Sequence, residues 1–155
     1  MSYIVPSLDL NVSIQSKSER KQRVNYRSRV NTIIYDPNCD LKILLISGKK
    51  DMNKWKLPGG GIEGEESGAN TAHRETWEEA GVLGKVGNYI SSFKNDKRKT
   101  NTFLYSFMCG EKLDVWPESN RNRRWVSIYE AFYLLIGEDR DMLISYATHL
   151  LKDSM

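Results

Sequence analysis

Residues 60–82 read GGIEGEESGANTAHRETWEEAGV, and this stretch decides the fold of the 155-residue chain. A glycine-rich turn leads into a segment that is predicted to form a short helix. On a helix of about 100° per residue, Glu75, Glu78 and Glu79 lie on one arc about 100° wide. Like charges at this spacing destabilise a helix by roughly a few tenths of a kcal/mol per pair, so three on one arc indicate a bound cation. Carboxylate oxygens favour Mg²⁺, Mn²⁺ or Ca²⁺ over zinc.

The spacing of this stretch resembles the Nudix box, GX5EX7REUXEEXGU, in which U is aliphatic. Gly60 is followed after five residues by Glu66 and after seven more by Arg74, which begins RETWEEAGV at residues 74–82. Eight of the nine fixed positions match, and the exception is Thr76, whose hydroxyl is expected to bond to the carbonyl one turn back. Glu66 and Arg74 are expected to form an ion pair that holds the loop on the helix. A solvated acidic helix face is the alternative, but it explains neither the glycine turn nor the distance to Glu66.

The arc and the glycine turn predict a metal site. Glu75 and Glu79 point the same way at i,i+4, so both are expected to bind the ion. The backbone carbonyl of Gly60 is the expected third ligand, because the glycines let the chain approach closely. Glu78 is the expected general base, a role that the resemblance assigns to the matching glutamate, and His73 and His149 are the competing bases. Mg²⁺ is the expected cofactor, with Mn²⁺ as an alternative.

Length and composition narrow the class of protein. The chain is long enough for one domain, and no run approaches about 18 apolar residues, so no membrane-spanning helix is expected. The N-terminal stretch lacks a basic start followed by an apolar core and is not expected to be a secretory signal. Cys39 and Cys109 are too few for a disulfide framework and are expected to be free core thiols. The expected location is the cytoplasm, with the nucleus as a second one.

Hydrophobic patterning predicts strands interleaved with a crossing helix. Residues 1–20 lack steady periodicity and are expected to form a flexible N-terminal arm, and residues 21–155 a single domain. The expected strands cover residues 30–35, 41–47, 86–93, 101–109 and 124–127. The expected helices cover residues 67–81, 128–136 and 141–152, with Gly81 and Ser127 as caps. This order favours an α/β or α+β layered domain. The resemblance implies the Nudix fold, a mixed sheet sandwiched between helices.

Basic residues gather in three clusters that flank the acidic stretch in the sequence. Residues 17–29 hold six basic residues against one acidic, residues 94–99 hold four against one, and residues 121–124 hold three. A metal-collecting acidic patch with basic clusters around it suits a small polyanionic substrate, because Arg and Lys donate to phosphate oxygens. Scattered solubilising charge explains any one cluster equally well, but it is less convincing for all three.

Segments outside the box resemble the diphosphoinositol polyphosphate phosphohydrolases, which also cleave diadenosine polyphosphates. The matching segments are Arg27 and Arg29, WKLPGGG at 55–61, FKNDKRK at 93–99 with TFLY at 102–105, and WPE at 116–118 with Arg121, Arg123 and Trp125. The resemblance covers residues 26–136 and implies metal-dependent hydrolysis of phosphoanhydride bonds. The expected substrate-binding residues are Arg27, Arg29, Ser47, Lys49, Gly59, Gly60, Gly61, Arg98, Lys99, Arg121 and Arg123.

The chain departs from this family at three places. Ser47-Gly48-Lys49 stands where the family has Ser-Ser-Arg, which keeps the charge but loses a hydroxyl and the two-pronged guanidinium. Thr100-Asn101 stands where the family has His-Arg, and a family lysine falls near Asp139 or Arg140. These differences bear on the order of substrate preference more than on the reaction.

Two other functions stay open. An mRNA-cap or nucleoside diphosphate-X hydrolase would use the basic clusters to bind RNA or a nucleotide, and preference for capped RNA would favour it. A non-catalytic Nudix-fold module would bind a phosphorylated ligand or RNA, but it has no reason to keep the repulsion among three glutamates. RNA is therefore a weaker candidate partner than a small polyphosphate. No membrane partner is expected, and the oligomeric state is open, a monomer being compatible with the sequence.

Overall fold

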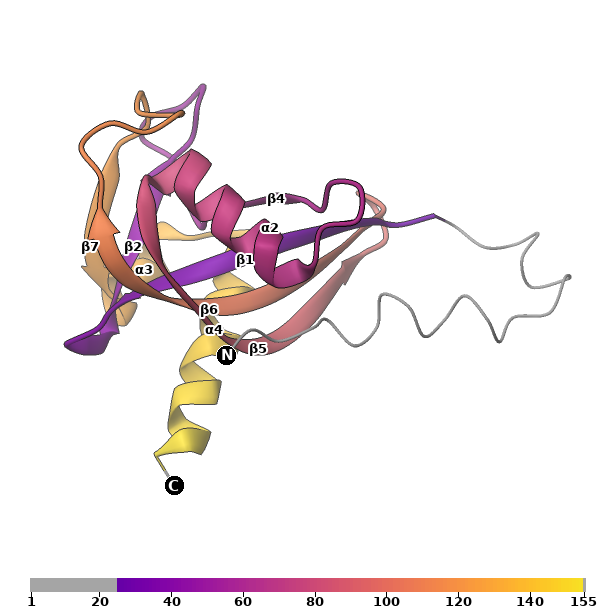
Figure 1. Ribbon diagram of the computed structural model, residues 1–155. Coiled ribbons are helices and arrows are strands. Elements are labelled where there is room, and N and C mark those ends of the chain that lie inside the picture. The colour runs from indigo at the N-terminus through magenta and orange to yellow at the C-terminus, as the bar shows by residue number, and fades with distance from the viewer. Residues whose placement is uncertain (1–24, 155) are drawn as a thin grey trace, which may run out of the picture.

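The computed structural model describes residues 25–154 and shows a mixed β-sheet with helices on both faces (Figure 1). The strands are β1 (Arg27–Asp36), β2 (Cys39–Ser47), β3 (Trp55–Lys56), β4 (Gly59–Gly61), β5 (Val82–Asn95), β6 (Thr100–Lys112) and β7 (Arg123–Ser127). The helical elements are α2 (Gly68–Glu75), its π-helical continuation η1 (Thr76–Ala80), α3 (Ile128–Leu134) and α4 (Gly137–Asp153). The expected arm at residues 1–20 lies outside the described residues.

The sheet contains one parallel pair among antiparallel ones. Its strand order is β3-β2-β1-β6-β5, while β4 also pairs with β1 and β7 with β2. Strands β1 and β6 run parallel, from Arg27 opposite Thr100 to Tyr35 opposite Met108. This arrangement confirms the expected mixed sheet between helices.

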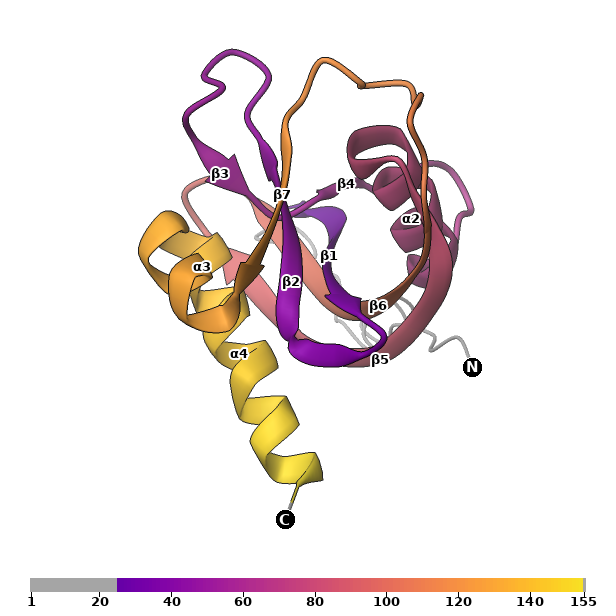
Figure 2. The same cartoon turned by 90° about the vertical axis from the view of Figure 1, so that its left-hand side faces the viewer.

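The two faces of β1 belong to two separate cores. Val30 and Ile34 pack with Ala72 of α2 in one cluster, whereas Ile33 packs with Leu143 of α4 in the other. This alternation follows from the period of two along a strand, with apolar residues on both faces of a central strand. Figure 2 shows α2 on one side of the sheet and α3 with α4 on the other. The strand β1 therefore carries side chains to both sides of the molecule.

The helix of the acidic stretch begins where expected but is not a uniform α-helix. The Ser67 hydroxyl accepts a hydrogen bond from Asn70 N at 3.1 Å, and Gly81 ends the segment with φ 63°. The last five residues widen into the π-helical turn η1. The expected bond of the Thr76 hydroxyl to a carbonyl one turn back is wrong: it lies 2.9 Å from the hydroxyl of Thr32 in β1. This pair of buried hydroxyls joins the turn to the central strand.

Short and exposed features differ most from the sequence prediction. Strands β3 and β4 are not among the expected strands, and they are only two and three residues long; β4 lies in the expected glycine-rich turn. Helix α4 begins at Gly137, four residues before the expected start. Both cysteines are free as expected, but Cys39 is exposed rather than in the core. Within residues 25–154, no helix combines the length and the apolar character needed to cross a bilayer.

Candidate active site

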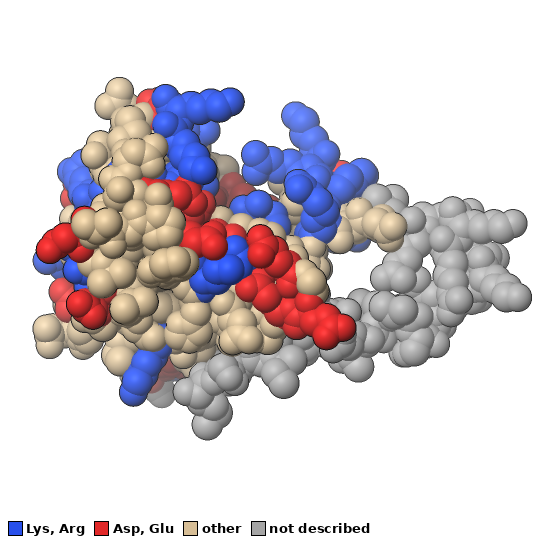
Figure 3. All heavy atoms as spheres, turned by 45° about the horizontal axis from the view of Figure 1, so that its top comes forward, with Lys and Arg blue, Asp and Glu red and all other residues tan. Residues whose placement is uncertain are grey.

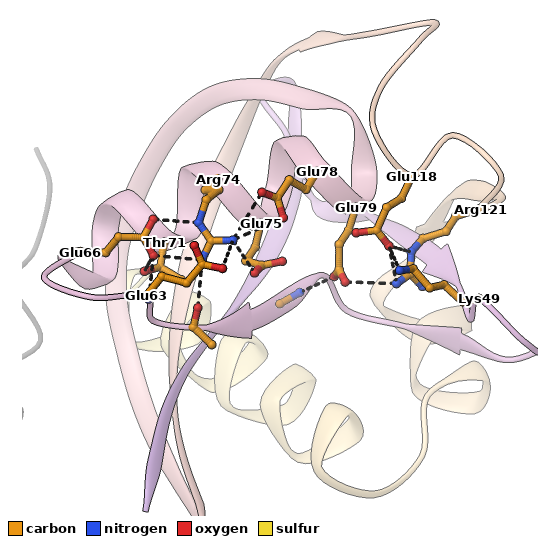
Figure 4. Close-up of polar contacts among 12 residues, drawn as sticks. Lys49, Glu63, Glu66, Thr71, Arg74, Glu75, Glu78, Glu79, Glu118 and Arg121 are labelled. Carbon is orange, nitrogen blue, oxygen red and sulfur yellow. Dashed lines mark hydrogen bonds and ion pairs between the residues drawn. The ribbon is translucent and has the colours of Figure 1, made fainter.

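Arg74 of α2 contacts several residues of the acidic stretch at once. Its Nε and Nη2 donate to the two carboxylate oxygens of Glu66 at 2.8 and 2.9 Å (Figure 4). Nη2 also donates to the carbonyl of Gly61 at 2.9 Å. Nη1 donates to Glu75 Oε1 at 2.8 Å and lies 3.3 Å from Glu78 Oε2. One guanidinium thus ties the loop, strand β4 and two glutamates of the helix together.

Replacing Glu66 by glutamine is expected to lower thermal stability at neutral pH and to have little effect near pH 2. The hydrogen bond from Arg74 lowers the pKa of Glu66 from 4.5 to about 2. A carboxyl whose pKa falls on folding stabilises the protein above its unfolded pKa, and this stabilisation is lost as the pH falls through the folded pKa. The Tm difference between wild type and E66Q, measured from neutral pH downward, should therefore shrink below about pH 4.5.

The exposed neighbour Glu65 supplies the control, because no partner among the described residues is recorded for its side chain. The E65Q variant should unfold close to wild type at every pH. A Tm difference for E66Q that stayed constant from pH 7 to pH 2 would contradict the ion-pair assignment.

Glu75 and Glu79 bring two buried carboxylates to the glycine strand β4. Their relative exposures are only 8% and 7%. Glu79 Oε1 accepts from the backbone N–H of Gly59 at 2.8 Å, and a Cβ at Gly60 would lie 2.2 Å from Glu75 Oε1. A side chain at that position would displace the carboxylate, so the close approach requires glycine. Burial raises the pKa of both carboxyls, and the charge of Glu79 raises that of Glu75 further.

The donor set at this point suits a hard divalent cation. Two buried like charges and the adjacent Gly59–Gly61 backbone supply oxygens only, the ligands that Mg²⁺ and Mn²⁺ take. A cation would relieve the burial and repulsion that raise the two pKa values. In the structure Glu75 contacts Arg74 instead, and Glu79 contacts Arg121. Among residues 25–154, no group of three His, Cys, Asp or Glu side chains is gathered for a metal.

Arg121 lies in a buried network behind Glu79. It is 6% exposed, and its Nη2 lies 3.1 Å from Glu79 Oε2 and 3.0 Å from Glu118 Oε1 (Figure 4). Its Nη1 donates to the carbonyl of Ser47 at 2.8 Å. The Ser47 hydroxyl is also engaged, accepting from Asn122 N at 2.8 Å. Lys49 pairs with Glu118 at 3.1 Å from the exposed side of this network.

Arg123 and Trp116 hold the end of the helical segment. The Arg123 guanidinium lies 3.8 Å from the Trp116 ring centroid and donates to the carbonyl of Ala80 at 3.1 Å. The Trp116 indole N–H donates to the carbonyl of Glu79 at 3.1 Å. These bonds satisfy carbonyls that a helix end leaves without partners. The roles of Trp116 and Glu118 in the site were missed, although both lie in a matching segment. Trp116 bonds to Glu79, 37 residues earlier, and Glu118 pairs with Lys49 from another loop as well as with Arg121.

A basic cavity opens on the other face of β1. It has a volume of about 290 Å³ and combines four cations with two carboxylates, namely Arg29, Lys54, Lys56, Arg98, Glu138 and Asp139. Lys54 and Lys56 were missed in the sequence, although Lys56 lies in the matching segment at 55–61 and Lys54 directly precedes it. Arg27 and Lys99 lie next to the cavity lining, joined by a bond from Arg27 N to the Lys99 carbonyl at 2.8 Å. Figure 3 shows basic side chains rising on two sides of a hollow above an acidic band.

The two histidines lie apart from the carboxylate arc. The His73 ring packs edge-on against Phe107 at 5.4 Å between centroids, and burial lowers its pKa. His149 lies on α4, where its Nε2 is 3.1 Å from Asn88 Nδ2 and 3.3 Å from Asp153 Oδ2. Neither ring is placed among Glu75, Glu78 and Glu79.

Residues 25–146 match the family model described as the NUDIX domain. The chain is 34% identical over 116 residues to diphosphoinositol polyphosphate phosphohydrolase 2 of Rattus norvegicus and of Homo sapiens, covering 73% of this chain and 65% and 64% of theirs. It thus spans less than two thirds of their length. It is 33% identical over 114 residues to diphosphoinositol polyphosphate phosphohydrolase 3-beta of Bos taurus, covering 71% of this chain and 70% of the relative.

A solved structure supports the fold. The solution structure of the E. coli ORF135 protein superposes with a TM-score of 0.63 at 24% identity, covering 81% of this chain and 91% of that one.

Proposed function

The chain belongs to the Nudix family, and we propose that it is a divalent-metal-dependent hydrolase of phosphoanhydride bonds in diphosphoinositol polyphosphates and diadenosine polyphosphates. One observation supports this most: the buried carboxylates of Glu75 and Glu79 meet at the glycine strand β4, which pairs with the segment of β1 that lines a cavity rich in cations. A polyphosphate can place its reacting bond at the carboxylates and its other phosphates along the cations. The names of the relatives supply the substrate class.

Glu75, Glu79 and the carbonyl of Gly60 would hold the ion, Mg²⁺ first and Mn²⁺ as an alternative. When bound, a divalent cation supplies a water of lowered pKa and offsets charge on the phosphoryl oxygens. Arg74 keeps Glu75 in place from the side of the loop, and Arg121 keeps Glu79 in place from the opposite side.

Glu78 is the proposed general base. Its side chain is 31% exposed to solvent. Glu78 lies on η1, the same helical segment as Glu79 and directly after the end of α2 at Glu75. Arg74 Nη1 lies 3.3 Å from one of its oxygens and can orient the carboxylate toward a water at Glu75 and Glu79. Glu78 then takes the proton from the attacking water, which is the step a general base performs.

Arg29 and Arg98 are the proposed phosphate-binding residues of the cavity wall, joined by Lys54 and Lys56. Arg27, Lys49 and Lys99 are proposed to bind phosphates from outside the cavity lining. The backbone of Gly59–Gly61 is proposed to contact the phosphate at Glu75 and Glu79. Ser47, Arg121 and Arg123 are already bonded within the protein, so we propose that they position the site without contacting the substrate.

The two free cysteines suit a reducing compartment, so the proposed location is the cytoplasm or the nucleus.

A hydrolysis panel, with the products separated by anion-exchange chromatography, tests the proposed function. It compares a diphosphoinositol polyphosphate, diadenosine pentaphosphate, ADP-ribose and capped RNA, each with Mg²⁺ and with Mn²⁺. Hydrolysis of the first two substrates, lost in EDTA, is the expected result. Preference for capped RNA would indicate a cap hydrolase instead, and binding without hydrolysis of any substrate would indicate a non-catalytic module.

Replacing Arg98 by alanine is expected to raise the KM for a diphosphoinositol polyphosphate by about tenfold, since a hydrogen bond to a charged group contributes roughly 1.5–3 kcal/mol. The effect on ADP-ribose should be much smaller, because its short pyrophosphate carries less charge and reaches fewer cations. Steady-state kinetics on both substrates measure the two effects. Arg98 lies in an exposed turn, so the fold should be unaffected.

Lys97 is the matched control, because it is a neighbouring exposed cation that does not line the cavity. The K97A variant should leave both KM values near wild type. Equal increases for the two substrates in R98A would contradict the polyphosphate assignment and favour a general nucleoside diphosphate-X hydrolase.

A further inference from the structure

The basic cavity holds an unexpected carboxylate. Asp139, in the first turn of α4, lines it together with Glu138 and with four cations from other elements. Asp139 Oδ2 accepts a hydrogen bond from the backbone N–H of Leu57 at 2.9 Å. Leu57 lies between β3 and β4, two residues before Gly59, so this bond ties α4 to the strand that meets Glu75 and Glu79. The carboxylate is therefore held in place relative to the proposed reaction centre.

Asp139 is not neutralised by a direct ion pair within the described residues. Burial raises the pKa of Asp139, and the hydrogen bond from Leu57 opposes this rise. The charges of Lys56, Arg29 and Arg98 oppose it too, although none of these cations forms an ion pair with Asp139. Its recorded bond is the one from Leu57, which uses one of the two oxygens. The second oxygen can accept a hydrogen bond from a ligand.

A phosphate is a poor occupant of this part of the cavity. The start of α4 would attract an anion through its free N–H groups and its dipole. Glu138 and Asp139 sit in that first turn and counter the attraction. A phosphate at Asp139 would also place two negative charges side by side in a partly buried space, which is unfavourable.

A neutral group that donates hydrogen bonds fits the same place. Its N–H or O–H groups would meet the carboxylate oxygens, and Trp55 and Ile136 add apolar surface to the lining. The nucleoside end of a nucleotide has both properties, because a base has an apolar face and an amine edge, and a ribose has hydroxyls. The cations that line the cavity remain available for the phosphates attached to the nucleoside.

We propose that Asp139 is a specificity-determining residue that excludes phosphate from this end of the cavity and receives the nucleoside end of a dinucleoside polyphosphate. The inference rests on the proposed function, and it selects diadenosine polyphosphates over the more densely charged inositol pyrophosphates as the preferred substrate of this chain.

The D139N variant tests this, because asparagine keeps an oxygen for the Leu57 N–H, removes the charge and replaces the second oxygen by an amide N–H₂. Isothermal titration with inositol hexakisphosphate and with diadenosine pentaphosphate measures binding without relying on turnover. In D139N the affinity for inositol hexakisphosphate should rise about tenfold, the effect of removing one repulsive charge in a partly screened site. Affinity for the dinucleotide should fall, as should its kcat/KM relative to an inositol pyrophosphate.

Asp141 supplies the matched control. It is an exposed aspartate of the same helix turn and does not line the cavity. D141N should change neither affinity, and equal tightening in both variants would show a general charge effect and overturn the inference. If D139N unfolds by circular dichroism, D139S replaces it, with a hydroxyl as the acceptor for Leu57. Unchanged binding in the folded variant also overturns the inference, whereas altered binding without hydrolysis of any substrate by wild type would overturn the proposed function alone.

Discussion

Replacing Glu78 by glutamine is expected to lower turnover by about 10²- to 10⁴-fold, the usual effect of losing a general base. Glutamine has nearly the same shape but cannot take a proton from water. The fold should be kept, because the side chain is partly exposed and its recorded contacts are with Arg74, at 3.3 and 3.5 Å. Phosphate release with saturating Mg²⁺ measures the effect, and circular dichroism verifies the fold.

Two glutamates provide the comparison for Glu78. The E65Q variant, on the exposed loop, should turn over like wild type. The E75Q variant should need more Mg²⁺ to reach half of its activity, whereas E78Q should have the wild-type Mg²⁺ dependence at a much lower rate. A loss of under tenfold in folded E78Q would rule out Glu78 as the base.

Replacing Arg121 by alanine is expected to destabilise the metal-free protein by about 3–5 kcal/mol, as when one partner of a buried ion pair is removed. The variant leaves Glu79 buried at 7% exposure without its cation. It also removes the donor to the Ser47 carbonyl. Urea unfolding in EDTA measures the change, because EDTA removes any ion that would take the place of the guanidinium at Glu79.

Arg124 is the matched control for Arg121. It pairs with Glu130 at the surface, and exposed pairs contribute roughly 0–1 kcal/mol. The R124A variant should therefore unfold near the wild-type urea concentration. If R121A and R124A unfolded together, the buried network would contribute little, and Arg121 would be better assigned to direct phosphate binding.

The grouping of the glycine turn, Glu66, Arg74 and Glu75 could be predicted because it depends on local geometry. Helix periodicity places side chains three and four residues apart on one face, and a turn of fixed length brings Glu66 back to Arg74. The structure brings these residues together as the spacing suggests. The layered order of strands and helices was predictable for a similar reason, since strand and helix periods differ along the chain. The mixed sheet sandwiched between helices was expected only from the resemblance to the Nudix family.

The contacts across the fold could not be predicted in the same way. The hydroxyl of Thr76 is bonded to Thr32, 44 residues earlier, and Arg121 is bonded to Glu79, 42 residues earlier. Basic residues near an acidic site look alike in a sequence whether they face solvent or a buried carboxylate. The same ambiguity explains Asp139, whose tie to Leu57 spans 82 residues. Burial decides these roles, and burial is a property of the assembled sheet.

The parallel pairing of β1 with β6 has a consequence for how the chain folds. Arg27 lies opposite Thr100, so this pairing can form only after a long intervening stretch of chain has been brought around. Contacts between such distant segments are slow to form, because the entropy of closing the loop is lost before the contacts stabilise it. Strand β4 and helix α2 lie inside that loop, and β4 has β1 as its partner in the described sheet. The local contacts between β4 and α2 do not need this pairing, but the contacts of Thr76 with Thr32 and of Glu79 with Arg121 link distant parts of the fold. The complete buried site therefore forms only as the central strands join.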